Sequence, residues 1–237
     1  MKNWVVISKP VKEKARGLAK YLNYLTNQNH KNHIGKTKII PLFGNENNLY
    51  KRVVYSVAEK ELSVANKRKG GRPISSFAQS FVFTLPEELG VNPTKAEWSF
   101  IAKELINTLV YFTGVSKEDL AKNIFINIHD QNNPHLNLVI SKVINGDVKN
   151  DLQKKTVINS LKKAFNLAVF RRFKITPLDY KPKTNRRKRY NSDYFKKNQD
   201  FLNQISRVNH PDPKLVFHQV PTTNSNKMKT VVGRRFE

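Results

Sequence analysis

The sequence contains no cysteine and no long apolar run. The absence of cysteine excludes disulfides, zinc ribbons, iron–sulfur clusters and thiol catalysis. No segment approaches the ~20 apolar residues that a membrane-spanning helix needs. The first residues also lack the apolar stretch and cleavage site of a signal peptide. These absences lead us to expect a cytoplasmic protein without membrane insertion.

Acidic residues are scarce. The 237 residues include 18 Asp and Glu against 43 Lys and Arg, which gives a formal net charge of +25. A positive field of this size attracts polyanions, and nucleic acid is the expected partner. The chain has no Gly-Lys-Ser/Thr phosphate-binding loop, so we expect no ATP-driven motor in it.

Apolar periodicity predicts alternating strands and helices. Strands are expected at 4–7, 37–43 and 77–85, and a paired set within 124–141. Pro41 indicates that the strand 37–43 is an edge strand or ends there. Helices are expected at 11–25, 48–65, 94–113 and 155–172, the third opened by a Thr-x-x-Glu capping box. Asn145-Gly146 is a typical two-residue hairpin turn. This order favours an α+β fold with an antiparallel sheet covered by helices in residues 1–180, and a basic extension in 181–237.

The segment 124–141 carries the most informative pattern. Two alternating apolar runs flank an Asp-Gln-Asn-Asn-Pro turn, with His129 before it and His135 after it. If the runs pair as half-buried strands, His129, His135 and Asn137 project from one face and the apolar residues from the other. Imidazole nitrogens and an amide oxygen suit Mn²⁺ or a similar divalent ion. A polar hairpin tip without metal is the alternative interpretation.

Two tyrosines lie on the predicted helix 11–25. Tyr21 is at the edge of the apolar stripe of this helix, whereas Tyr24 lies nearly opposite it. Core packing therefore does not explain Tyr24, and its phenol could reach a ligand. A partly solvated surface tyrosine is the simpler alternative.

Two basic segments are candidates for contacts with a nucleic acid backbone. The first is the loop Lys67-Arg68-Lys69-Gly-Gly-Arg72, which could follow a line of phosphates. The second lies in the extension and contains Arg186, Arg187, Lys188 and Arg189 beside aromatic residues, which suits phosphate contacts and base stacking. A solvated linker and a disordered tail are the alternatives.

The phrase from Ile128 to Asn137, Ile-His-Asp-Gln-Asn-Asn-Pro-His-Leu-Asn, resembles the metal motif of plasmid mobilisation relaxases, which belong to the HUH (His-hydrophobe-His) endonuclease class. The resemblance covers residues 3–172 as an order of elements and 124–145 as a motif. It places the metal ligands at His129, His135 and Asn137, and the nucleophile at Tyr24 with Tyr21 as the second choice. The third ligand position holds Asn instead of His, and the interval between the histidines is one residue shorter than usual.

The resemblance implies a DNA relaxase that nicks one strand at a plasmid transfer origin. A divalent cation, Mn²⁺ or Mg²⁺, would polarise the scissile phosphate while a tyrosine attacks phosphorus, giving a 5′-phosphotyrosine and a free 3′-hydroxyl. No nucleotide cofactor is implied. Single-stranded or hairpin origin DNA would be the partner, with auxiliary mobilisation proteins as further candidates.

Other interpretations stay open at this level. A rolling-circle replication initiator would use the same constellation, and a non-catalytic basic DNA-binding module would need none of its chemistry. A tyrosine phenol has a reference pKa of ~10 and needs help to attack at neutral pH. Asp130, Glu59 and Glu61 are candidates for orienting a histidine.

Overall fold

A five-stranded antiparallel sheet forms the centre of the computed structural model, which describes residues 4–66 and 73–180. The strand order is β1-β3-β5-β4-β2. The strands are β1 (Val5–Pro10), β2 (Lys38–Phe43), β3 (Ala78–Thr84), β4 (Ile124–Asp130) and β5 (His135–Ser141). The predicted α+β fold with an antiparallel sheet is therefore confirmed.

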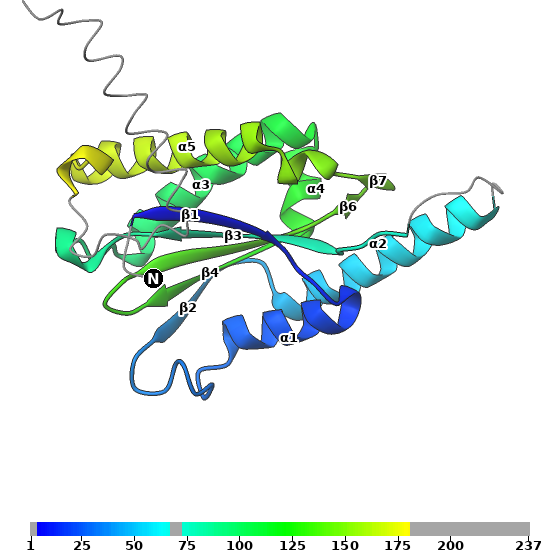
Figure 1. The fold of residues 1–237 in the computed structure, drawn as a ribbon, viewed down its shortest axis with the longest axis horizontal. Helices are drawn as coiled ribbons and strands as arrows, with labels where there is room; N and C mark the ends of the chain where they lie inside the picture. Colours follow the sequence, from blue (N-terminus) through cyan, green and yellow to red (C-terminus); the bar gives the residue numbers. More distant parts are fainter. Residues whose placement is uncertain (1–3, 67–72, 181–237) are drawn as a thin grey trace, which may run out of the picture. The chain divides into compact units, whose positions relative to one another are not determined.

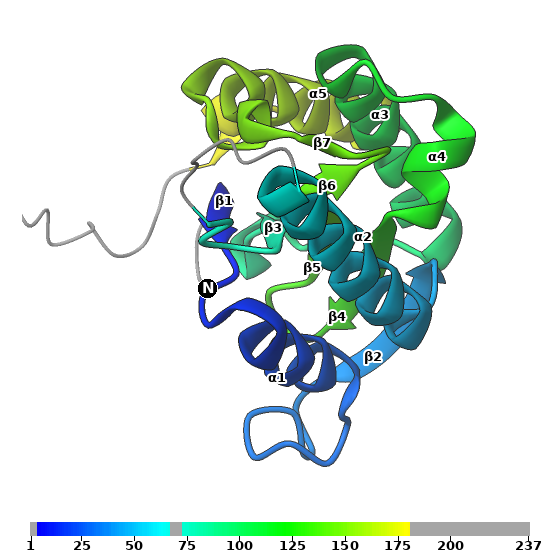
Figure 2. The same ribbon diagram turned by 90° about the vertical axis from the view of Figure 1, so that its right-hand side faces the viewer.

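Helices cover both faces of this sheet. Helices α1 (Lys14–Thr26) and α2 (Glu46–Asn66) lie on one face, and α3 (Lys95–Thr113) and α5 (Lys155–Phe173) on the other (Figure 1). Figure 2 shows α1 and α2 beside each other, away from α3 and α5. A fifth helix, α4 (Lys117–Lys122), was not predicted, because six residues are too few for a periodic apolar pattern.

Shorter elements connect these layers. Strands β6 (Val143–Ile144) and β7 (Asp147–Val148) form the hairpin that the Asn-Gly pair predicted. Both turn residues have positive φ, as a type I′ hairpin turn requires. The 3₁₀ segments are η1 (Glu87–Leu89), η2 (Asn150–Gln153) and η3 (Pro177–Asp179). Within the described residues, no helix combines the length and the apolarity needed to cross a membrane.

Several local predictions are confirmed in detail. Thr94 and Glu97 form the capping box at the start of α3, with hydrogen bonds in both directions. Pro41 lies on β2, an edge strand, where proline is tolerated, and a register shift follows it. Helix α1 begins later than predicted, because Glu13 and Lys14 both have positive φ and turn the chain away from β1.

The central strands β4 and β5 are buried on both faces. Their isoleucines and leucines pack under α3 and α5, while Phe125 and Val139 pack under α1 and α2. The expectation of half-buried strands was wrong, because helices cover the sheet on both sides. The polar side chains of the motif share the face under α1 and α2, so they lie inside the protein and not on a solvated hairpin.

Candidate functional site

His129 and His135 lie directly opposite each other on β4 and β5. Their ring centroids are 5.0 Å apart, and their exposed fractions are 1% and 8%. Nε2 of His129 donates to the carbonyl oxygen of Leu25 at 3.0 Å, and Nδ1 of His135 donates to that of Asn133 at 3.1 Å. Since a carbonyl oxygen only accepts, each bonded nitrogen carries the proton, and the lone pair stays on the other ring nitrogen.

Burial keeps both histidines neutral at neutral pH. Loss of solvation lowers the pKa of His129 from 6.5 to about 4 and the pKa of His135 to about 4 as well. The backbone hydrogen bond of each ring acts in the opposite direction but is the smaller effect. A metal binds the neutral imidazole, so both side chains are in the protonation state that coordination needs.

Asn137 lies beside this pair with an exposed fraction of 2%. Its amide nitrogen donates to Oδ1 of Asn127 at 3.2 Å, which leaves its own amide oxygen available as a ligand. Asn127 in turn donates to the carbonyl oxygen of Leu25 at 2.5 Å. Leu25 therefore accepts from both Asn127 and His129, and these bonds fasten the end of α1 to β4.

The donor set fits a hard or borderline divalent ion that retains further ligands. Two imidazole lone pairs and one amide oxygen are of the types that Mn²⁺ accepts. In the described part of the chain, no three His, Asp or Glu side chains are arranged to hold a metal by themselves. An ion at this site would thus need the amide of Asn137, and water or phosphate oxygens would fill the remaining positions.

Tyr24 is brought to the histidines by the fold. Its ring centroid lies 6.2 Å from that of His129, 4.7 Å from that of His33 and 4.9 Å from that of His30. The side chain is half-buried. The expectation that Tyr24 faces away from the packed side of α1 was therefore wrong, because the loop after α1 folds back over the last helical turn.

His30 and His33 also lie beside Tyr24, and neither was predicted from the sequence. The ring of His33 lies 4.7 Å from that of His129, and its exposed fraction is 2%. Its Nδ1 donates to the carbonyl oxygen of Asn27 at 2.8 Å, while its Nε2 is buried without a hydrogen-bond partner. The His-x-x-His spacing directly after the tyrosine helix was the available signal, and the rings of His30 and His33 do lie near each other, with centroids 5.4 Å apart.

Tyr21 lies in a different environment. Its hydroxyl shares a hydrogen bond of 2.6 Å with the hydroxyl of Ser80 on β3. Burial raises the pKa of the Tyr21 phenol above its usual value, while the bond to Ser80 acts in the opposite direction. A phenol whose pKa is raised is harder to ionise, so Tyr21 is the weaker candidate for a nucleophile.

Of the remaining candidate residues, the structure describes Glu59, Glu61 and Asp130. Glu59 and Glu61 are exposed on α2. Asp130 lines a surface cavity near the loop after α1. Among the described residues, backbone carbonyls and not carboxylates hold the two histidines of the hairpin. Lys67, Arg68, Lys69 and Arg72, and likewise Arg186, Arg187, Lys188 and Arg189, lie outside the described residues.

Comparison with known proteins identifies the fold. No known family matches the sequence, and no curated protein is significantly similar to it. Among solved structures, the chain is similar to the MobM relaxase domain (MOBV; Mob_Pre) bound to plasmid pMV158 oriT DNA in a Mn-bound crystal structure at pH 6.8. That match has a TM-score of 0.52 and 13% identity, and covers 81% of this chain and 98% of the other. A second Mn-bound crystal structure of that complex, at pH 5.5, gives a TM-score of 0.50, 11% identity and the same coverage. The chain thus has the fold of a relaxase domain.

Proposed function

We propose that this protein is a DNA relaxase of the HUH class that nicks one strand at a plasmid transfer origin. The observation that carries the proposal is the meeting of Tyr24 with His129, at 6.2 Å between ring centroids, at one end of the sheet. The fold shared with the MobM relaxase domain and the net charge of +25 agree with a DNA substrate.

Metal binding is assigned to His129, His135 and Asn137, in a variant of the motif with an amide at the third position. A bound Mn²⁺ or Mg²⁺ would polarise the scissile phosphate and neutralise charge that develops on its oxygens. The chain's own contribution is to hold two neutral imidazoles with their tautomers fixed by carbonyls. These bonds orient the ligands before any ion arrives.

The reaction is a transesterification at phosphorus. Oη of Tyr24 forms a bond to phosphorus while the bond from phosphorus to the 3′ oxygen of the DNA breaks. The phenol proton is lost and the departing 3′ oxygen gains one, which gives a 5′-phosphotyrosine and a free 3′-hydroxyl. Because the phosphotyrosine ester keeps the energy of the broken bond, the strand can be rejoined without a nucleotide cofactor.

Substrate binding is assigned to the basic segments. Lys67, Arg68, Lys69 and Arg72 would contact the DNA backbone from the segment that follows α2 in the sequence. Arg186, Arg187, Lys188 and Arg189 would do so from the extension. Auxiliary mobilisation proteins are further proposed partners, since a transfer origin is a specific site within a long duplex.

Mass spectrometry of a covalent adduct tests the proposal. The full chain is incubated with Mn²⁺ and a randomised pool of single-stranded oligonucleotides that carry a labelled 3′ end, and the modified peptide is sequenced. We expect the adduct on Tyr24. Tyr24→Phe should abolish the adduct while oligonucleotide binding persists, because the substitution removes only the hydroxyl.

Tyr21→Phe is the matched control, since it removes a hydroxyl three positions earlier on the same helix. It should retain adduct formation. An adduct on Tyr21, or full cleavage by Tyr24→Phe, would overturn the assignment of the nucleophile. Binding without any adduct in Mn²⁺ or Mg²⁺ would favour the non-catalytic DNA-binding module instead.

A further inference from the structure

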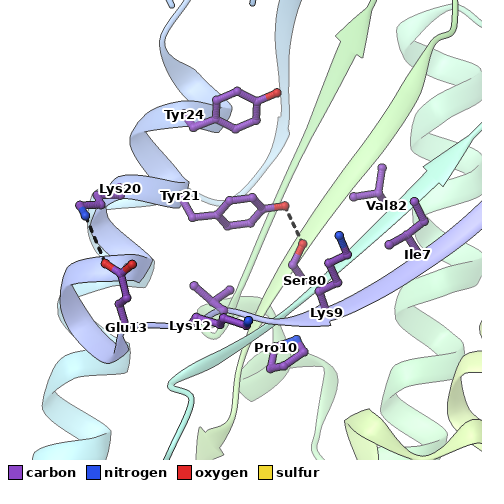
Figure 3. A pocket seen from close by; sticks show the side chains of 12 residues that line it. Ile7, Lys9, Pro10, Lys12, Glu13, Lys20, Tyr21, Tyr24, Ser80 and Val82 are labelled. Atoms are coloured by element: carbon purple, nitrogen blue, oxygen red, sulfur yellow. Dashed lines mark hydrogen bonds and ion pairs between the residues drawn. The ribbon is translucent and has the colours of Figure 1, made fainter.

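A cavity of about 800 Å³ lies next to the proposed nucleophile, between α1 and the edge of the sheet formed by β1 and β3 (Figure 3). Tyr24 forms part of its wall, so the cavity begins where the proposed reaction occurs. The proposed chemistry does not use the rest of it. Its lining includes Ile7, Lys9, Lys12, Tyr21, Tyr24 and Val82.

The interior of the cavity is aromatic and aliphatic. The rings of Tyr21 and Tyr24 are stacked, with centroids 6.5 Å apart and planes inclined by 19°. The hydrogen bond from Tyr21 to Ser80 holds the first ring in place over β3. Ile7 and Val82 are paired across β1 and β3, and both are only partly buried among the described residues, so they form an apolar floor to the cavity. Flat rings above an apolar floor suit a planar heterocycle.

The rim of the cavity is positively charged. Lys9 and Lys12 are exposed, and within the described residues neither has a carboxylate within ion-pair distance. Lys20 is also at the rim, where it pairs with Glu13 at 3.1 Å. Exposed lysines beside an aromatic cavity match the chemistry of a nucleotide, which has a flat base and a charged phosphate.

We infer that this cavity binds one unpaired nucleobase of the DNA strand, from the nucleotide that adjoins the phosphate attacked by Tyr24. The inference rests on the proposed function and adds a binding subsite to it. Tyr21 is then a stacking residue, which explains why its hydroxyl is engaged with Ser80 instead of facing the histidines. Lys9 and Lys12 neutralise the neighbouring phosphate.

A single-nucleotide probe tests this subsite without any cleavage. The four deoxynucleoside 3′,5′-bisphosphates are titrated into the full chain, and binding is followed by methyl NMR of Ile7 and Val82. Deoxyribose 3′,5′-bisphosphate, which lacks the base, is the matched probe. We expect at least one nucleotide to shift both methyl signals and to bind about tenfold more tightly than the sugar bisphosphate, the size of effect that stacking produces.

Substitutions that fill the cavity distinguish base binding at this site from a general attraction of the lysines to phosphate. Val82→Phe should weaken nucleotide binding about tenfold and leave the affinity for the sugar bisphosphate unchanged. Ile7→Phe repeats the test from β1, should Val82→Phe fold poorly. The control is Asn48→Phe, which fills a separate cavity of about 630 Å³ at the start of α2 and should change neither affinity.

The outcomes distinguish this inference from the proposed function. Equal affinity for nucleotide and sugar bisphosphate, or an equal loss for both on filling, would refute the subsite. Neither result bears on whether Tyr24 forms an adduct. Conversely, normal nucleotide binding by a chain that forms no adduct would support the base-binding site and refute the proposed relaxase activity.

Discussion

The ring of His129 donates a hydrogen bond of 3.0 Å to the carbonyl oxygen of Leu25, the residue after Tyr24. This contact joins the hairpin that carries the histidines to the helix that carries the tyrosine. It fixes the tautomer of His129 and the position of the last turn of α1 at the same time. The proposed metal ligand His129 and the helical turn that carries the proposed nucleophile are therefore coupled through one backbone carbonyl.

Removing either hairpin histidine should weaken metal binding more than removing a neighbouring histidine. We expect His129→Ala and His135→Ala each to raise the dissociation constant for Mn²⁺ by roughly tenfold or more, since each removes a proposed imidazole ligand. Even the loss of a residue that only supports a metal ligand typically weakens metal binding by about this factor. Isothermal titration calorimetry measures the change. His30→Ala is the control, because Nδ1 of His30 accepts a hydrogen bond from the backbone of Asn32. An unchanged affinity in His135→Ala would contradict the assigned site.

Asn137 offers a graded test of the third position. Asn137→Ala should weaken Mn²⁺ binding several-fold. Asn137→His should strengthen Mn²⁺ binding, because imidazole is a better donor than an amide oxygen for such ions. The same calorimetric titration applies. Asn127→Ala would separate direct ligation from support, since Asn127 contacts Asn137 at 3.2 Å and is assigned no ligand role. Tighter binding by Asn137→Ala would be incompatible with coordination through the amide.

The stability of the metal-free protein should fall in mildly acidic solution. The folded pKa of His129 and of His135 is about 4, below the 6.5 of the unfolded chain, so the unfolded state binds more protons between these values. This contribution is complete above pH 6.5 and is lost as the pH falls towards 4. Each histidine accounts for on the order of 3 kcal/mol, at 1.36 kcal/mol per pKa unit.

Urea unfolding in the presence of a chelator, at pH values from 7 to 4, measures this dependence. The double variant His129→Gln, His135→Gln has neither titrating group, so its unfolding free energy should vary less over that range even if it is lower throughout. A wild-type curve that is flat between pH 6.5 and 4.5 would show that the two imidazoles are not buried in the neutral form.

Gly44 should tolerate no side chain. Its φ is +75°, and a Cβ at this position would lie 2.4 Å from the carbonyl oxygen of Ile124, where β4 begins. Gly90 has a φ of +62°, but no atom of the described residues lies within 4 Å of such a Cβ. Gly90→Ala should therefore cost about 1 kcal/mol from backbone strain alone, and Gly44→Ala clearly more. Urea midpoints compare the two, and equal costs would argue against the close approach.

DNA affinity should depend steeply on salt. The logarithm of the binding constant for a single-stranded oligonucleotide should fall linearly with the logarithm of the salt concentration, with a slope of about −0.7 for each neutralised phosphate. Lys9→Ala should reduce the slope by roughly one such contact. Lys103→Ala is the control, because Lys103 is exposed on α3, on the opposite side of the sheet. Fluorescence anisotropy measures the salt dependence of both variants. Equal slopes would show that Lys9 does not contact the DNA.

Local rules predicted most of the elements from the sequence. The capping box at Thr94, the Asn145-Gly146 turn and the edge position of Pro41 each depend on neighbouring residues only. Alternation in 124–141 also placed His129, His135 and Asn137 on one face, because a strand repeats every two residues. Helix α4 was not predicted, since its 6 residues are too few to show a periodic apolar pattern.

The sequence by itself determined the residue types that could form a site: two histidines and an amide on a hairpin, a tyrosine on a helix, and a large positive charge. Only the tertiary structure decided which of them meet. His33 enters the site, and Tyr21 turns to Ser80, through contacts between segments far apart in the chain. Side-chain periodicity is a local property, whereas these contacts depend on how helices and loops pack over the sheet.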